Sequence, residues 1–173
     1  SGKFCLDQVQ ALSPRVPDRP EVRAVLDAYE AKLALDDLVH FLSGQKELSK
    51  GHFVGSQACL PCHTQAAEVW KLSLHAHGLE TLEKIQRDKN PECLLCHTVG
   101  FGFVSGFSDR ASTEGLAHIG CESCHGVGSE HVANPALPFD IVTENVCKDC
   151  HTPLNSPKFD FPLYWGKIAH GLD

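Results

Sequence analysis

Four copies of one short motif carry most of the chemistry that this sequence can do. Each copy places two cysteines three residues apart and a histidine directly behind the second cysteine. Thiolates and imidazoles bind metals, thiols also pair as disulfides, and this motif is known from haem attachment. The four copies span residues 59–63, 93–97, 121–125 and 147–151.

Only one of these chemistries uses every residue of the motif. A disulfide framework gives no reason for a histidine after each cysteine pair. Tetrahedral zinc would take two cysteine pairs per ion, so four pairs would fill two sites and leave the histidines unexplained. Covalent haem c uses both thiols and the histidine, and Cys-x-x-Cys-His is its signature. We therefore predict four covalent c-type haems, with one iron each, attached to the following residues: Cys59, Cys62, Cys93, Cys96, Cys121, Cys124, Cys147 and Cys150.

The spacing within the motif has a physical reason. Residues three apart lie on one face of a helical turn, so both thiols reach one edge of a porphyrin. The next residue then offers its imidazole to the iron from below the ring. The predicted proximal iron ligands are His63, His97, His125 and His151.

The composition also predicts the second axial ligand of each iron. The chain has eleven histidines and no methionine, so the Met/His pairing of high-potential cytochromes is excluded. Seven histidines remain for four irons, which predicts four bis-histidine, low-spin haems. His75 and His77 point in different directions on one helical stretch, so they can serve two haems. The predicted distal ligands are His75, His77, His131 and His170, with His118, His52 and His40 in reserve in that order.

Bulk properties narrow the class of partner. The formal charge of −7 argues against nucleic acid, because binding phosphates needs a basic face. No run of residues approaches the length of a membrane span, so no span is predicted. Cys5 stands outside the four motifs. The sequence leaves open a chance thiol, an intermolecular disulfide or a lipid anchor, and favours the first two.

The haem motifs also set the organisation of the chain. We divide it into an N-terminal arm with an amphipathic helix, residues 1–50, and a tetrahaem cytochrome c domain, residues 51–173. A helix is predicted from Asp18 to Gly44, and a second from about 65 to 86. The proline-rich tail from 152 to 165 is expected to be extended. The predicted fold is mainly α with extensive loops, organised around four covalent haems, with little or no sheet.

Several stretches resemble the cytochrome c554-like tetrahaem family. They are "VGSQACLPCH", "SLHAHG", "CLLCHTVGFG", "IGCESCHGVGSEHV" and "NSPKFDFPLYWGKIAHG". The resemblance carries over to the four motifs, to His75 and His131 as distal ligands, and then to His77 and His170. His118 is a departure, since the family pattern has a small residue at this position. The resemblance implies electron transfer in the periplasm or outside the cell, and some relatives polymerise into filaments.

We therefore expect an electron-transfer protein rather than an enzyme, with redox proteins as partners and no substrate of its own. It is expected to be exported to the periplasm or beyond. Two states of assembly stay open: a homopolymeric filament in which haems follow one another, and a monomer whose N-terminal arm packs on its own domain. Two alternatives stay open. One is a periplasmic redox enzyme that acts on nitrogen compounds at an open haem. The other is a module that delivers electrons to a partner enzyme.

Overall fold

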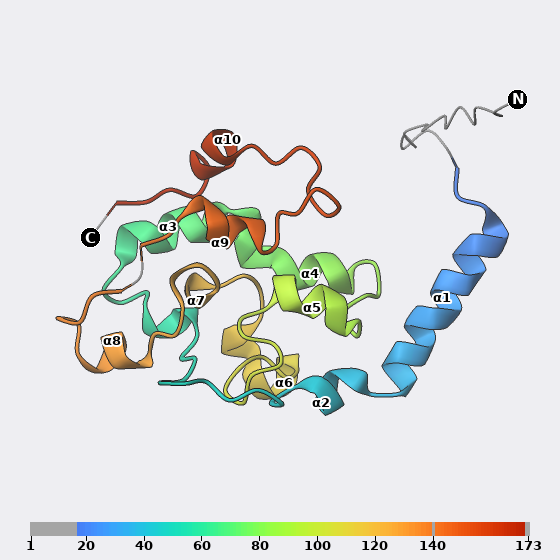
Figure 1. Cartoon of the computed structure of the whole chain (residues 1–173), viewed down its shortest axis with the longest axis horizontal. Coiled ribbons are helices and arrows are strands. Elements are labelled where there is room, and N and C mark those ends of the chain that lie inside the picture. Colours follow the sequence, from blue (N-terminus) through green and yellow to red (C-terminus); the bar gives the residue numbers. More distant parts are fainter. Residues whose placement is uncertain (1–16, 140, 172–173) are drawn as a thin grey trace, which may run out of the picture.

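Short helices joined by long loops make up the computed structural model, which describes residues 17–139 and 141–171 (Figure 1). Two isolated β-bridges, Lys46–Phe103 and Thr98–Ala117, are all the strand pairing within these residues. The prediction of a mainly helical fold with extensive loops is confirmed. No helix in the described ranges is long and apolar enough to cross a membrane. The helices are α1 Pro20–Leu35, α2 Leu38–Leu42, η1 Ser56–Ala58, α3 Thr64–Leu72, η2 Leu74–His77, α4 Gly78–Glu83, α5 Pro91–His97, α6 Arg110–Thr113, η3 Glu114–Leu116, α7 Cys121–His125, α8 Ser129–Ala133, α9 Glu144–Lys148 and α10 Phe161–Trp165.

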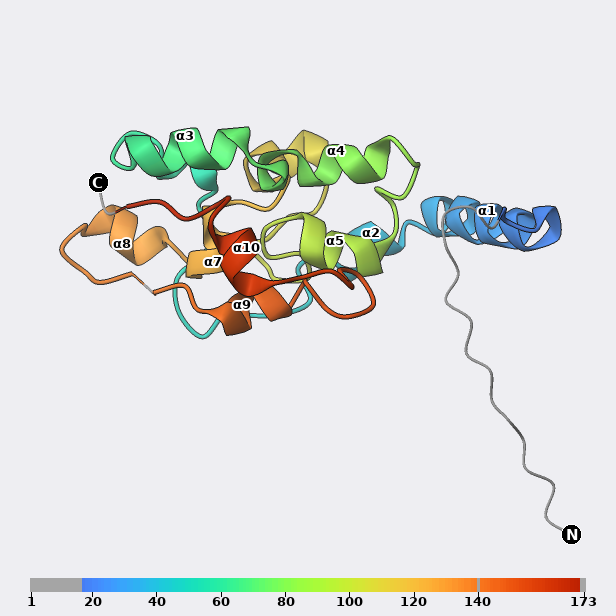
Figure 2. The same ribbon diagram turned by 90° about the horizontal axis from the view of Figure 1, so that it is seen from above.

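The N-terminal helix is shorter than predicted and projects from the rest of the chain (Figures 1 and 2). It begins at Pro20, whose fixed φ suits a first turn, but the Asp18 side chain does not cap it. It ends before Asp37, which has a left-handed backbone with φ 48°, and α2 follows in a new direction. The predicted irregular arm comprises residues 1–17, of which residues 1–16 lie outside the described residues. Cys5 lies there too.

Only the C-terminal part of α1 packs on the body. Leu33 is buried, whereas Val22, Val25 and Tyr29 are 56%, 68% and 48% exposed. Asn90 donates from Nδ2 to Glu30 Oε1 at 3.2 Å, which fastens this end of the helix. Most of the apolar face of α1 therefore lies open along the projecting part.

The protein core is small and lies between α4, α5 and the loop 98–107. Leu79, Leu94 and Val99 are its most deeply buried side chains, and Phe101 and Phe107 pack with them. The loop is tight enough to require glycine, because a Cβ on residue 106 would meet the carbonyl oxygen of residue 100 at 1.7 Å. Val39 of α2 packs in the same cluster, so the two sides of the boundary predicted after residue 50 are in contact. The boundary itself stays a prediction.

Two other segments differ from their predicted structure. The helix predicted from 65 to 86 is broken at Ser73, whose extended backbone has ψ 160°. The tail predicted to be extended contains α10, because the Asp160 side chain accepts from Leu163 N at 3.0 Å and Pro162 suits the first turn. Both differences come from local capping and backbone conformation, which the pattern of apolar residues does not predict.

Candidate haem-binding site

All four cysteine–histidine motifs form helical turns. α5 and α7 each contain a whole motif. In the first and fourth motifs the histidine backbone N–H donates to the carbonyl of the first cysteine, at 3.1 Å for His63 and 2.8 Å for His151. The two thiols of each motif and its histidine therefore have the arrangement that the spacing predicts. The eight motif cysteines are free thiols, and no group of three or more His, Cys, Asp or Glu side chains in the described residues could hold a metal ion by itself.

Three motif histidines lie opposite a histidine from outside the motifs. The ring centroids are 6.1 Å apart for His63 and His131, and 5.8 Å apart for His125 and His170. His151 faces His75 at 6.1 Å. These contacts bring together residues 45 to 76 positions apart in the sequence, so tertiary structure and not local geometry creates them.

The spacing of these pairs fits two imidazoles bound to one metal. A metal–imidazole nitrogen bond is about 2.0 Å long, so two rings on opposite sides of a metal have centroids roughly 6 Å apart. The hydrogen bonds fit as well. The Nδ1 atom of His131 contacts Leu137 O at 2.8 Å, and that of His170 contacts Gly171 O at 3.3 Å. A carbonyl only accepts, so Nδ1 carries the proton and the lone pair of Nε2 is left for a metal.

The electrostatics of one pair also fit metal binding. Burial, and then the neighbouring His151, lowers the pKa of His75. Burial likewise lowers the pKa of His151. A lowered pKa keeps both rings neutral near pH 7, and the neutral imidazole is the form that binds a metal. The donor set present therefore fits a bis-histidine haem at three of the four motifs.

Thiols from different motifs lie next to one another. The side chains of Cys59 and Cys121 are hydrogen-bonded, which raises the pKa of Cys59 and lowers that of Cys121 to about 6. Burial, and then a hydrogen bond with Cys96, raises the pKa of Cys150 to about 12. The first motif thus adjoins the third, and the second adjoins the fourth. This pairing places cysteines of two different motifs side by side.

His97, the histidine of the second motif, differs from the other three motif histidines. Its Nδ1 atom contacts Gly78 O at 2.7 Å, and no histidine ring faces it within the described ranges, which include all eleven histidines. His77, predicted as a distal ligand, has its ring 6.4 Å from that of His118 instead. The His77 assignment therefore stays a prediction. His40 and His52 are exposed and face no ring among these residues.

Sequence reasoning missed the side chains that hold the ligands in place. Glu122, a variable position inside the third motif, is only 3% exposed. Its carboxylate accepts from the backbone N–H groups of Val54, Gly55 and Gly128, the last two at 2.8 Å. Phe139 stacks on both His125 and His131, at 5.5 and 5.2 Å. An acidic residue between two cysteines carries no signal that it is buried, so this network could not be predicted from the sequence.

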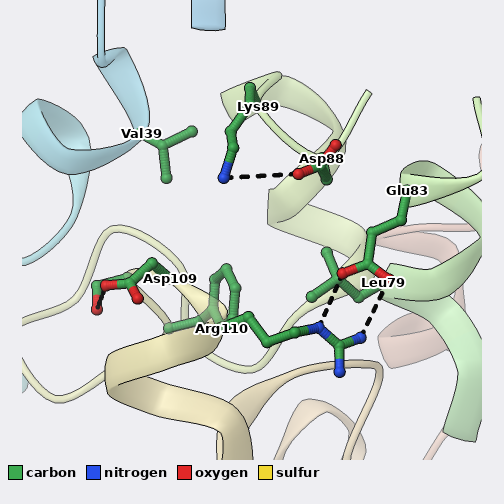
Figure 3. A pocket seen from close by; sticks show the side chains of 9 residues that line it. Val39, Leu79, Glu83, Asp88, Lys89, Asp109 and Arg110 are labelled. Atoms are coloured by element: carbon green, nitrogen blue, oxygen red, sulfur yellow. Dashed lines mark hydrogen bonds and ion pairs between the residues drawn. The ribbon is translucent and has the colours of Figure 1, made fainter. Parts of the chain in front are cut away.

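A small cavity lies away from the motifs, beside α4 and α6 (Figure 3). Its volume is about 20 Å³, room for one water. Arg110 borders it and pairs with Glu83 through two contacts of 2.8 and 3.2 Å. No motif residue lines it, so it is not part of the haem-binding site.

Comparisons with known proteins all find cytochromes. The family model described as cytochrome c554 and c-prime matches residues 58–126. Cytochrome c-554 of Nitrosomonas europaea is 33% identical over 101 residues, which cover 50% of this chain and 43% of that protein. The C-type polyheme cytochrome OmcB of Geobacter sulfurreducens is 34% identical over 64 residues, 34% of this chain and 9% of that protein. The chain thus spans less than half the length of these curated relatives.

A solved structure gives the same result for the fold. The reduced state of cytochrome c554 from Nitrosomonas europaea aligns with a TM-score of 0.53, over 67% of this chain and 82% of that one. The sequence identity of this match is 22%, so it bears on the fold alone. Together with the family model, it confirms the resemblance predicted from the sequence.

Proposed function

Because the chain resembles the cytochrome c554-like multihaem cytochromes, we propose that it is an exported electron-transfer protein with four covalent haems, one at each motif. One observation carries the proposal: three motif histidines each lie opposite a second histidine at 5.8–6.1 Å between ring centroids. Haem iron, when bound, supplies reversible one-electron transfer and needs no catalytic group from the protein.

The residues of the chain have three tasks in this proposal. The motif cysteines fix each haem covalently, and the adjoining thiols of Cys59 with Cys121 and Cys96 with Cys150 keep the attachment points close. The histidine pairs supply both axial ligands at three motifs. Phe139 and Phe159 stack on ligand rings, Phe159 on His151 at 4.8 Å, and hold their orientation. Short distances between fixed redox centres are what electron transfer requires.

Mass and spin state test this proposal together. When the protein is expressed with export in a host that attaches haem c, it should gain the mass of four haems. The Cys147→Ser, Cys150→Ser variant should gain the mass of three. The spectrum should show three low-spin haems and one high-spin haem, because the chain presents no histidine to the His97 side. His77→Ala should leave this ratio unchanged. A haem-free product would contradict the proposal. Four low-spin haems, reduced to three by His77→Ala, would instead restore the prediction of four bis-histidine haems.

A second candidate function is redox catalysis at the haem of the second motif. It is favoured by the same observation, that no histidine ring in the described residues faces His97. An iron with one free axial position binds small molecules, and nitrogen compounds are the substrates expected from the sequence. Carbon monoxide binding to one ferrous haem per chain, with turnover of hydroxylamine or a nitrogen oxyanion, would favour the enzyme. Binding without turnover would favour the carrier.

Export and partners belong to the proposal as well. We propose that the protein acts in the periplasm or outside the cell, because haem c is attached covalently after export. There a homopolymer would pass electrons from subunit to subunit. Support for the homopolymer comes from α1, which projects from the body with an exposed apolar face (Figure 2). Such a face fits a second copy of the chain in an open, heterologous contact.

Replacing this face should abolish assembly. We expect the full chain to pellet as fibres of uniform width, and the Val22→Glu, Val25→Glu variant to remain monomeric. Ala24→Ser, on the same exposed helix, is the control and should still form fibres. A single sharp monomer peak from the unaltered chain at high concentration would contradict the homopolymer and leave the electron carrier in place.

A further inference from the structure

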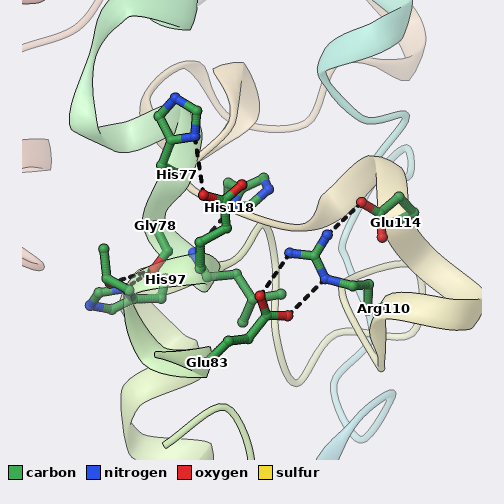
Figure 4. Close-up of polar contacts among 10 residues, drawn as sticks. His77, Gly78, Glu83, His97, Arg110, Glu114 and His118 are labelled. Atoms are coloured by element: carbon green, nitrogen blue, oxygen red, sulfur yellow. Dashed lines mark hydrogen bonds and ion pairs between the residues drawn. The ribbon is translucent and has the colours of Figure 1, made fainter. Parts of the chain in front are cut away.

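One peptide group lies between two histidines and is hydrogen-bonded to both. Its carbonyl end, Gly78 O, contacts Nδ1 of His97 at 2.7 Å. Its amide end, Leu79 N, donates to Nδ1 of His118 at 3.2 Å. Figure 4 shows His97 and His118 on either side of this segment at the start of α4. The predicted proximal ligand of the second motif is thus linked to a histidine that lies outside every motif.

The chemistry of the peptide group fixes the tautomers of both rings. A carbonyl only accepts, so His97 Nδ1 carries a proton and its Nε2 lone pair is left for iron. An amide N–H only donates, so His118 Nδ1 carries the lone pair. Burial, followed by the Arg110 guanidinium, lowers the pKa of His118, which agrees with the neutral ring that this bond needs.

The backbone around His118 holds its ring in place. His118 has a left-handed backbone, φ 71°, which costs on the order of 1 kcal/mol for a residue other than glycine. Ile119 N donates to His75 O at 3.1 Å, and Val99 N donates to Leu116 O at 2.9 Å. A Cβ on residue 78 would meet Ile119 Cδ1 at 2.1 Å, so the two segments are in close contact. The backbone on both sides of His118 is therefore held in place, and the position of its ring follows from the backbone.

We propose that His118 is a positioning residue for the second motif, which sets the strength of the His97 hydrogen bond through the Gly78–Leu79 peptide group. The inference rests on the proposed function, because it requires a haem at Cys93 and Cys96 with His97 as its proximal ligand. It concerns the electron donation of that ligand and not the transfer of a proton.

The direction of the effect follows from hydrogen-bond cooperativity. A peptide N–H that donates polarises its own carbonyl, and each bond in such a chain strengthens its neighbour by about 10–30%. A stronger acceptor at Gly78 O draws the Nδ1 proton of His97 and makes its Nε2 a better electron donor. Better donation stabilises ferric over ferrous iron. Loss of the His118 acceptor should therefore raise the reduction potential of this one haem.

Two substitutions distinguish the effect of the hydrogen-bond acceptor at residue 118 from the effect of its left-handed backbone. Glycine and asparagine both tolerate a left-handed backbone, so neither variant adds strain at residue 118. His118→Gly removes the acceptor, whereas His118→Asn places Oδ1 where Nδ1 was. In a redox titration of the holoprotein, His118→Gly should shift the ferric–ferrous equilibrium of one component at least threefold toward ferrous iron, about 28 mV at 59 mV per tenfold. His118→Asn should restore it.

The affected component must be the one that is missing from the Cys93→Ser, Cys96→Ser variant. No shift in His118→Gly, an equal shift in both variants, or a shift of all four components would overturn the inference and leave the proposed function intact. A holoprotein mass that shows no haem on the second motif would overturn both. The mass is measured first, so the two failures are distinguished.

Discussion

Glu122→Ala should lower the free energy of unfolding by about 4 kcal/mol, the largest effect we expect from one substitution. The carboxylate is buried and accepts from the N–H groups of Val54, Gly55 and Gly128. Hydrogen bonds to a charged group contribute about 1.5–3 kcal/mol each, and a buried donor left without a partner costs about 1–3 kcal/mol. Alanine removes all three acceptor contacts at once and leaves the N–H groups inside the fold.

Denaturant unfolding of the holoprotein, followed by far-UV circular dichroism, measures this change. Glu130→Ala is the matched control, because the Glu130 side chain is 43% exposed and contacts Lys50 in a surface ion pair at 2.5 Å. Surface pairs contribute about 0–1 kcal/mol, so this variant should be near the unaltered chain. Equal losses in the two variants would show that the buried network does not stabilise the fold.

His131→Ala should convert one of the haems from low spin to high spin while the protein keeps its full haem mass. The ring of His131 lies 6.1 Å from that of His63, and its Nδ1 bond to Leu137 O leaves the Nε2 lone pair for a metal. Thioether bonds lie on the motif side of the haem, so losing the distal ligand does not detach it. Electron paramagnetic resonance and absorption spectra of the oxidised protein measure the change.

His52→Ala is the control for this substitution. His52 is exposed, and its ring faces no other ring among the residues that the structure describes; its backbone N–H donates to Ser129 Oγ at 3.0 Å. Its spectrum should equal that of the unaltered chain. An unchanged spectrum in His131→Ala, or a high-spin haem in His52→Ala, would move the ligand assignment from one histidine to the other.

The sequence was sufficient for the parts of the site whose geometry is local. Each Cys-x-x-Cys-His motif closes within one helical turn, so its form follows from its spacing. The prediction of mainly short helices with almost no sheet is confirmed for the same reason, since glycines, prolines and motifs divide the chain. His75 and His131, predicted as distal ligands, each lie opposite a motif histidine, and their ligation stays a prediction.

The parts that could not be predicted depend on how distant segments meet. His77 and His118 look alike in the sequence as spare histidines, and only the left-handed backbone at His118 brings the two rings together. Ser73 breaks a stretch whose apolar pattern favours one helix, and so sets the directions of the histidines that follow. Glu122 shows no sign of burial in the sequence, because its three donors come from residues up to 68 positions away.

The adjoining thiols have a consequence for the order of events during maturation. Cys59 and Cys121 come from different motifs, and in the folded chain their side chains are already hydrogen-bonded. In an oxidising compartment, a chain that folded first would bring these thiols together as a disulfide, and one such bond would block two attachment sites. Attachment of haem before folding, while the chain is still extended and each cysteine pair is separate, would avoid this bond.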